Sequence, residues 1–343
     1  MRREVDLADE RAVAADGTDA ERHVETSLRP TRLSDFVGQR ELVGHLGIVL
    51  GAARTLGHSV DHLLFAGPPG LGKTSLAAIV ATELNVGLRV TSGPVLTRPG
   101  DLAAQLSDLE EHDVLFIDEI HRLPRAVEEV LYPAMEDHRL DVLLGRGPTA
   151  RSIRMELPDF TLIGATTRTG LVASPLRDRF GFVGQLDLYE VDELERIVER
   201  SASLLAVTIT SGGAAVIARR SRGTPRIANR LLRRVRDFAT VSGAHEVDDA
   251  LASEALTLFG VDERGLDKMD RRILELLCRQ FRGQPVGLLT LAHALGEEPA
   301  TLEDAYEPYL LRSGLLVRTP RGRIATDAAY RHVGISAPGG GLV

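Results

Sequence analysis

The chain of 343 residues lacks tryptophan and holds a single cysteine, Cys278. A lone cysteine excludes a disulfide within the chain, and because Cys278 follows an apolar run we expect a small buried side chain. No apolar run approaches the roughly 18 to 20 residues that span a bilayer. Residues 1–6 carry charges of both signs and lack the apolar core of a secretory signal. These absences predict a cytoplasmic protein without a membrane segment.

An excess of positive charge is also missing, since the formal net charge is −8. A protein that coats nucleic acid with its whole surface would be basic, so the net charge argues against that class. Two local clusters of arginine without acidic residues remain, at 219–236 and 312–323. The first is typical of a solvated helical face. The second contains Arg318, Arg321 and Arg323 around a tight turn, which predicts either a hairpin tip that binds DNA phosphates or a solvated hairpin.

Residues 67–74 match the pattern G-x-x-x-x-G-K-[ST]. An apolar segment typical of a buried strand precedes them, and residues 75–84 have helical spacing, which is the context that a phosphate-binding loop requires. Backbone N–H groups of such a loop and the following helix start bind phosphate oxygens. Lys73 is then expected to reach the β- and γ-phosphates and Thr74 to ligate Mg²⁺. The alternative, a chance glycine-rich turn, is disfavoured by these flanks.

Acidic and polar residues follow two further apolar strands. Asp118 and Glu119 end the strand expected at 113–117, and Thr166 ends the one expected at 160–165. Ligands of α/β proteins bind at this edge of the sheet. We therefore expect Asp118 to hold Mg²⁺ and Glu119 to polarise the water that attacks the γ-phosphate. Threonine also ends many strands for packing reasons, so the role of Thr166 stays open at this point.

The order of predicted elements indicates an α/β fold: a parallel sheet domain, a small helical domain and a C-terminal winged helix. Its last sheet strand is expected at 185–189, and residues 1–27 are expected to form a flexible tail. Residues 28–189 form the sheet domain, in which alternating runs predict a β-hairpin at about 140–157. Four helical stretches make up residues 190–260, and three helices with a hairpin make up residues 261–343. His112 and His121 lie in the sheet domain without a nearby cysteine, so no zinc site is expected.

These motifs together resemble the AAA+ ATPases, and five further segments resemble the RuvB family of bacterial Holliday junction branch migration motors. The resemblance runs from about residue 28 to 335 and includes residues 28–30, 118–123, 131–137, 174–180 and 318–323. It implies ATP and Mg²⁺ as cofactors, with Thr74 and Asp118 on the metal. It also implies nucleotide contacts from Leu28, Arg29, Gly70, Gly72, Lys73, Thr74, Ser75, Glu136, Asp137, His138, Arg179, Tyr189 and Arg226.

The resemblance assigns further roles. Glu119 and Asp118 are catalytic, Thr166 is a first sensor of the nucleotide, and Arg226 is a second sensor. Arg179, or its neighbour Arg177, is a finger donated to the next subunit. His138 stands where relatives commonly carry an aromatic residue, which weakens the implied contact at that position.

The implied partners are double-stranded DNA at four-way junctions, further copies of the chain in a homo-hexamer, a RuvA-like protein at the 140–157 hairpin, and a junction-resolving nuclease. Arg318, Arg321 and Arg323 are the implied DNA contacts. Two other functions remain open from the sequence: an AAA+ clamp loader or remodelling ATPase, and a nucleotide-dependent winged-helix switch that binds DNA. Stimulation of ATP hydrolysis by junction DNA would separate them.

Overall fold

The computed structural model describes residues 25, 27–144 and 151–337, so most of the expected tail lies outside the described residues. The described chain divides into two compact units, which we call the sheet unit and the helical unit. The sheet unit covers Leu28–Glu193. The helical unit covers Leu194–Val343 together with the residues that precede Leu28.

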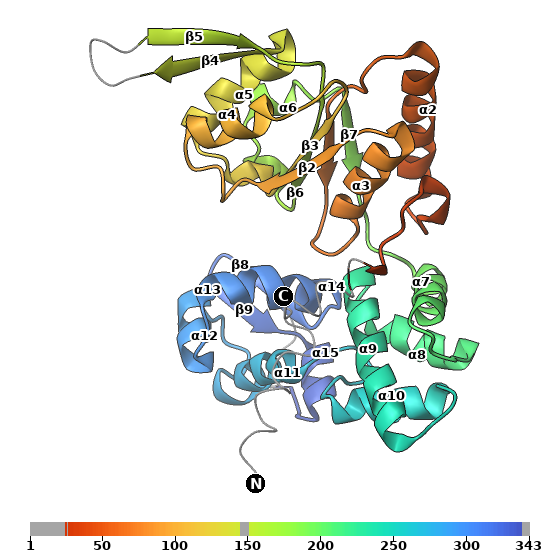
Figure 1. The fold of residues 1–343 in the computed structure, drawn as a ribbon. Helices are drawn as coiled ribbons and strands as arrows, with labels where there is room; N and C mark the ends of the chain where they lie inside the picture. Colours follow the sequence, from red (N-terminus) through yellow and green to blue (C-terminus); the bar gives the residue numbers. More distant parts are fainter. Residues whose placement is uncertain (1–24, 26, 145–150, 338–343) are drawn as a thin grey trace. The chain divides into compact units, whose positions relative to one another are not determined.

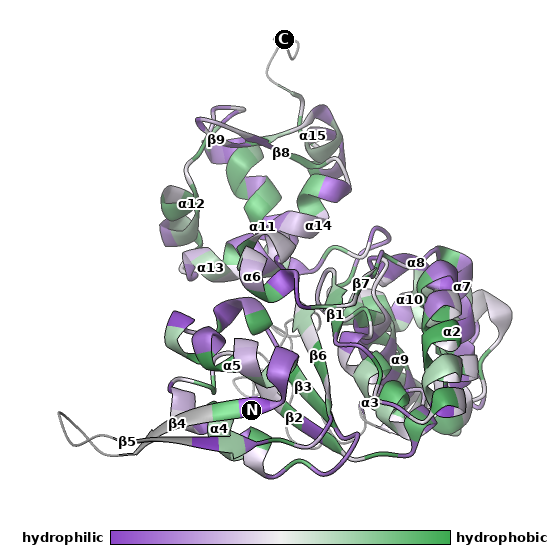
Figure 2. Cartoon of the chain, turned by 90° about the horizontal axis from the view of Figure 1, so that it is seen from above, coloured by the Kyte–Doolittle hydropathy of each residue, from purple (hydrophilic) through white to green (hydrophobic). Residues whose placement is uncertain are grey.

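The sheet unit is built on five parallel strands in the order β2-β3-β6-β1-β7. Every residue of β1 and β6 is buried, as expected for a parallel sheet that is covered on both faces. Figure 2 colours β3 and β6 largely as hydrophobic. The strands are β1 (Leu63–Ala66), β2 (Leu88–Ser92), β3 (Val114–Asp118), β6 (Thr161–Thr166) and β7 (Phe182–Gln185).

Helices cover both faces of this sheet (Figure 1). Leucines of α4 and α5 pack with Leu115, Ile117 and Leu162 on one face, and α3 contacts β3 and β6 on the other. The result is a three-layer α/β/α unit. Its helices are η2 (Leu33–Asp35), α2 (Arg40–Leu56), α3 (Lys73–Leu84), α4 (Pro99–Ser107), η3 (Ile120–Arg122), α5 (Arg125–Asp137), η5 (Thr169–Leu171) and α6 (Ser174–Arg177).

A separate two-stranded hairpin follows α5. Strands β4 (Arg139–Leu144) and β5 (Arg151–Glu156) pair antiparallel, with Leu140 opposite Met155. Figure 1 shows this hairpin extending away from the sheet. Its turn, residues 145–150, is not among the described residues. The alternating sequence of the two strands therefore predicted the pairing that the structure contains.

The position predicted for the last strand was wrong. β7 is Phe182–Gln185 rather than residues 185–189, and it pairs parallel with β1. Two glycines, Gly181 and Gly184, hid the strand because glycine is depleted in strands. Gly184 is required by packing, since a Cβ at that position would lie 2.5 Å from Leu42 Cδ1 and 3.2 Å from Phe65 Cδ1. The strand thus carries glycine where α2 approaches the sheet.

The helical unit contains the four helices predicted for residues 190–260, then a three-helix core with a two-stranded wing. Buried apolar side chains of the winged-helix part form one core cluster, and further apolar side chains are buried in the four preceding helices. The last helix, α15, was not predicted. The elements are α7 (Val191–Leu204), α8 (Ser211–Arg220), α9 (Pro225–Ser242), α10 (Asp249–Leu258), α11 (Lys268–Glu275), a π-helical stretch (Leu276–Gln280), α12 (Leu288–Leu295), α13 (Pro299–Thr301), a second π-helical stretch (Leu302–Tyr306), α14 (Glu307–Arg312), β8 (Leu316–Thr319), β9 (Gly322–Ala325) and α15 (Asp327–Val333).

Cys278 is buried in this unit, and burial raises the pKa of its thiol to about 11. Across the described residues, no helix has both the length and the apolar character needed to cross a membrane.

The packing at Gly184 generates a prediction with a matched control. Gly184→Ala should destabilise the protein by about 1 to 3 kcal/mol, because the added methyl group overpacks the contact with Leu42. Gly44→Ala, in α2 with open space around it, should instead stabilise by about 0.5 to 1 kcal/mol through higher helix propensity. Urea unfolding of both full-length variants measures the two free energies. Equal effects of the two changes would show that β7 is not tightly packed against α2.

Candidate functional site

The phosphate loop lies between β1 and α3. Gly67, Gly70 and Gly72 have φ values of +142°, +79° and +108°, which only glycine adopts readily, so the loop can curl around an anion. Lys73 is buried, and its Nζ donates hydrogen bonds to the carbonyl oxygens of Gly67 at 2.7 Å and Pro68 at 2.8 Å. The ammonium group is therefore held over the loop. Thr74 and Ser75 follow in the first turn of α3.

Tyr189 supports this loop from the end of the sheet unit. Its hydroxyl donates to the carbonyl oxygen of Leu71 at 3.1 Å, and burial raises the pKa of the phenol. Phe36 packs close to Gly72 on the same side. Leu28 is buried and Arg29 half-buried at the start of the unit. The structure thus places Tyr189 against the loop, and gives it a structural hydrogen bond that the sequence did not predict.

The acidic pair lies at the carboxyl end of β3. Asp118 Oδ1 accepts a hydrogen bond from the Glu119 N–H at 2.9 Å. Glu119 has a left-handed backbone, with φ of +47°, and opens the 3₁₀ turn η3. Its Oε2 lies 2.9 Å from Arg122 Nη1. Both carboxylates are half-buried, so they are accessible to a ligand at this edge of the sheet.

Thr166 lies at the same edge, at the end of β6. Its hydroxyl oxygen lies 2.9 Å from His121 Nδ1 and accepts a hydrogen bond from the Arg168 N–H at 3.0 Å. Burial lowers the pKa of His121, against the opposing effect of the nearby Glu119 carboxylate, so the ring is favoured in its neutral form. Only 1% of Thr166 is exposed, whereas the next residue, Thr167, is exposed. The sequence singled out Thr166 but missed its partner His121, whose place two residues after Glu119 was the available signal.

Arg179 lies at the opposite edge of the sheet from the phosphate loop of its own chain. It precedes β7, whose first residue, Phe182, pairs with the first residue of β1. Its guanidinium group bonds the carbonyl oxygen of Pro175 at 2.6 Å and Glu136 Oε1 at 3.1 Å, and lies 4.6 Å from the centre of the Tyr132 ring. Its Nε is buried without a hydrogen-bond partner among the described residues. Its neighbour Arg177 is exposed.

Glu136, Asp137 and His138 share this opposite edge. His138 Nδ1 lies 3.0 Å from Asp159 Oδ1, just before β6 begins, and Asp137 pairs with Arg139. β6 is six residues long, which separates its two ends by roughly 20 Å. The structure therefore places these three residues far from the phosphate loop of their own chain, and their nucleotide contacts stay a prediction. Near them, donor atoms of Glu111, His112 and Asp159 lie within 4.8 Å of one another.

Arg226 belongs to the helical unit. Pro225 occupies the first position of α9, so Arg226 follows directly in the first turn. Its side chain is 40% exposed, and its Nε lies 3.1 Å from Glu25 Oε1. The arginine is therefore presented at a helix start.

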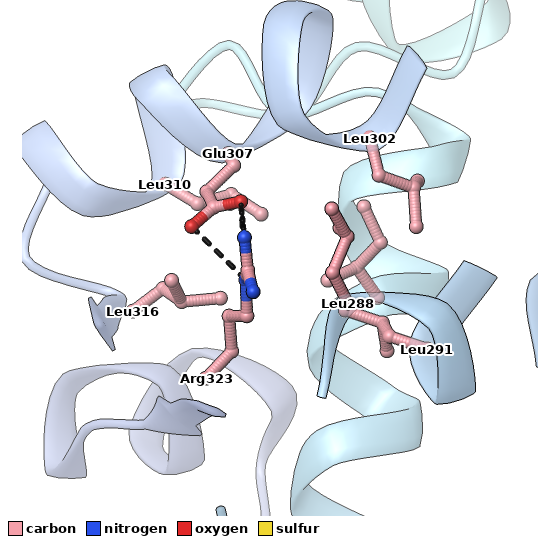
Figure 3. Close-up of a pocket in the computed structure, with 8 residues that line it drawn as sticks. Leu288, Leu291, Leu302, Glu307, Leu310, Leu316 and Arg323 are labelled. Carbon is pink, nitrogen blue, oxygen red and sulfur yellow. Dashed lines mark hydrogen bonds and ion pairs between the residues drawn. The ribbon is translucent and has the colours of Figure 1, made fainter. Parts of the chain in front are cut away.

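The wing places Arg318 opposite Arg323 across the β8–β9 pair, with Arg321 exposed in the turn. Arg323 is buried, and its guanidinium group forms a two-pronged ion pair with Glu307, with its Nη2 2.8 Å from Oε2 (Figure 3). Leucines of α12 and α14 line the small cavity around this pair. Arg318 is half-exposed and contacts Glu303 and Glu307.

This arrangement of Arg323 was not expected, because its charge points inward at Glu307; the predicted contact of Arg323 with DNA stays a prediction. The sequence could not show this, since Glu307 lies 16 residues away on another element.

Comparisons with known proteins cover nearly the whole chain. The family "Holliday junction DNA helicase RuvB P-loop domain" matches residues 28–186, "RuvB AAA lid domain" matches 189–262, and "RuvB C-terminal winged helix domain" matches 263–334. The Holliday junction branch migration complex subunit RuvB of Saccharopolyspora erythraea is 58% identical over 330 residues, or 96% of this chain and 94% of that protein.

Solved structures agree. The chain is similar to the Thermotoga maritima RuvB Holliday junction branch migration motor, with 50% identity, a TM-score of 0.82, and 91% of this chain and all of that one covered. A mutant of the same protein gives a TM-score of 0.83 at 50% identity, with 91% and 99% covered.

Proposed function

The chain belongs to the RuvB family, and on this basis we propose that it is an ATP-driven motor that moves double-stranded DNA through Holliday junctions in recombination and DNA repair. The observation that carries the proposal is one chain in which a RuvB phosphate-loop domain, a RuvB lid and a RuvB winged helix follow one another. The winged helix favours this function over a clamp loader. The acidic turn beside the phosphate loop favours an active ATPase over a DNA-binding switch.

The residues of the phosphate-loop edge support ATP as the substrate. We propose that residues 67–75 hold the phosphates, with Lys73 supplying the charge that its contacts keep over the loop. The Thr74 hydroxyl and the Asp118 carboxylate are oxygen donors of the kind Mg²⁺ prefers, and the bound ion would neutralise phosphate charge. Glu119 is the proposed base that polarises the attacking water, and Thr166 the proposed first sensor. We propose that the adenine and ribose are framed by Leu28, Arg29 and Tyr189. Arg226 is the proposed second sensor.

The position of Arg179 supports a ring. An arginine at the far edge of the sheet cannot reach the nucleotide of its own chain, but a head-to-tail neighbour would receive it. We propose that Arg179 is this finger, that Glu136, Asp137 and His138 contact the neighbour's nucleotide from the same edge, and that the ring is a hexamer. A finger neutralises charge that develops in the transition state.

We further propose that Arg318 and Arg321 contact the DNA backbone, while Arg323 holds the wing in place through Glu307. A chain with a net charge of −8 can bind DNA in this way if each subunit presents one small basic wing to the duplex.

The hairpin of β4 and β5 is the proposed docking element for a RuvA-like partner, and a junction-resolving nuclease is a proposed further member of the complex. The proposed compartment is the cytoplasm.

Glu119→Gln tests the motor function. This change should preserve ATP binding and slow hydrolysis by about 10² to 10⁴-fold, because the amide cannot accept the proton of the attacking water. Wild type should dissociate a synthetic four-way junction in the presence of ATP, more strongly with the junction-binding partner, and the variant should not. ATP hydrolysis by wild type that never moves a junction would favour a loader or remodelling ATPase.

Mixing two inactive variants tests whether Arg179 acts on the nucleotide of a neighbouring subunit. Arg179→Ala alone should lower hydrolysis by about 10³ to 10⁵-fold, and Lys73→Ala should abolish phosphate binding. In a mixture, some interfaces combine an intact Arg179 with an intact Lys73, so ATP hydrolysis should partly recover. Arg177→Ala serves as the control and should hydrolyse ATP like wild type. Failure of the mixture to recover activity, with rings intact by light scattering, would place Arg179 in its own chain's site.

Substitutions in the wing separate a DNA contact from a structural ion pair. Arg321→Ala should weaken binding to all duplex sequences and reduce the slope of log affinity against log salt by about 1, because one phosphate contact is lost. Arg323→Ala should instead lower the free energy of unfolding by about 1 to 3 kcal/mol, because the buried Glu307 loses its two-pronged partner and keeps only the half-exposed Arg318. Fluorescence anisotropy at several salt concentrations and urea unfolding measure the two effects. A stable Arg323→Ala protein with the salt slope reduced by about 1 would restore Arg323 as a DNA contact.

A further inference from the structure

Arg222 lies in the turn between α8 and α9, and its side chain enters the winged-helix part of the chain. It has a left-handed backbone, with φ of +57°, and is only 6% exposed. Its Nε donates to the carbonyl oxygen of Gly265 at 2.7 Å, and its Nη2 bonds Asp270, a fully buried residue in the first turn of α11. One side chain thus joins the lid to two separate points of the winged helix.

Two further residues complete the contact. Arg312, at the end of α14, donates from Nη2 to the carbonyl oxygen of Arg222 at 2.8 Å. The Tyr309 ring faces both guanidinium groups, with ring-centre distances of 4.7 Å to Arg222 and 5.3 Å to Arg312. The Tyr309 hydroxyl in turn donates to the carbonyl oxygen of Arg264. The backbone of the turn and its side chain are therefore both bonded to the winged helix.

The buried charges make this contact between the lid and the winged helix rigid and costly to separate. Burial raises the pKa of the Asp270 carboxyl, and the Arg222 guanidinium group opposes that shift by favouring the charged carboxylate. A buried ion pair of this kind is strongly disfavoured when one partner leaves, because the remaining charge is uncompensated. The fork of the guanidinium group also fixes its direction, since two bonds leave it at set angles.

The connection from Arg222 to Arg226 is short. Gly223, Thr224 and Pro225 lie between them, the Thr224 N–H donates to Ser221, and Pro225 begins α9. A displacement of Arg226 must therefore be transmitted through this turn to Arg222.

We propose that Arg222 is a positioning residue that joins the second-sensor turn rigidly to the winged helix, so that movement of the lid on nucleotide exchange moves the DNA-binding wing. The inference rests on the proposed motor function. It assigns to a buried arginine, which touches neither nucleotide nor DNA, the coupling between the two.

Arg222→Lys is the main test, because it keeps the positive charge but cannot bond Gly265 and Asp270 together. Arg219→Lys, on the exposed face of α8 three residues away, is the matched control. Spin labels at Val241→Cys in the lid and Ala294→Cys in α12 report the lid-to-wing distance distribution; both native residues are exposed, and the buried Cys278 should not react. We expect a narrow distribution for wild type and Arg219→Lys, and a broad one for Arg222→Lys.

Coupling is measured as junction DNA dissociated per ATP hydrolysed. It should fall by at least about fivefold in Arg222→Lys, while hydrolysis without DNA and duplex affinity stay as in wild type. A narrow distance distribution with unchanged coupling would overturn the proposal, as would a loss of DNA-free hydrolysis that matches the loss of junction movement. If wild type moves no junction, the motor function fails, but the distance measurement still decides whether the joint is rigid.

A second variant tests the proposal in case Arg222→Lys does not fold. Arg312→Gln removes the bond to the Arg222 carbonyl oxygen and the contact with Tyr309, but leaves the buried ion pair in place. If circular dichroism shows that Arg222→Lys is unfolded, Arg312→Gln carries the test. It should broaden the distance distribution and lower coupling in the same direction, to a smaller extent. An Arg312→Gln protein that is indistinguishable from wild type in both measurements would contradict the joint.

Discussion

Parallel pairing of β1, β3 and β6 is the constraint on which the rest of the sheet unit depends. Because the strands run in one direction, the phosphate loop, the acidic turn and Thr166 all emerge at one edge. The same pairing puts the residues before β6 and β7, including Arg179, at the other edge. A chain built in this way separates its own phosphate loop from its own Arg179, the proposed finger, and the proposed ring brings the two edges of neighbouring copies together.

Contacts between a guanidinium group and a carboxylate are a second recurring feature of the structure. Arg179, Arg222 and Arg323 each meet a carboxylate, and the first two also face a tyrosine ring. A planar guanidinium group can satisfy a carboxylate, a carbonyl oxygen and an aromatic face at once, which an ammonium group cannot. Their different exposure then separates their roles. Arg222 and Arg323 are buried, whereas the partly exposed Arg179, whose Nε has no hydrogen-bond partner in the described part of the chain, is suited to an exchange of partners.

The sequence predicted the features that depend on patterns of neighbouring residues. A glycine pattern between an apolar strand and a helix is sufficient to locate the phosphate loop, and apolar runs located the other sheet strands. β7 was misplaced because its Gly184 serves packing against Leu42, which no local pattern reveals. The contact of His121 with Thr166 joins residues 45 apart, and that of Arg222 with Asp270 joins residues 48 apart. A charge pattern shows that an arginine exists but not which acid it meets in the fold, so the burial of Arg323 was also missed.

The acids beneath the wing bear on how the protein would travel along DNA. Glu303 and Glu307 already compensate part of the charge of Arg318, so a phosphate that meets this arginine gains less than it would from a free one. In the proposed motor, a shallow attraction would lower the barrier between successive phosphates, so the wing would slide over the duplex with little friction. Strong binding and easy release are opposed for any contact that must be broken and remade at every step. In the proposed ring, several weak wings would together hold the duplex while each one releases easily.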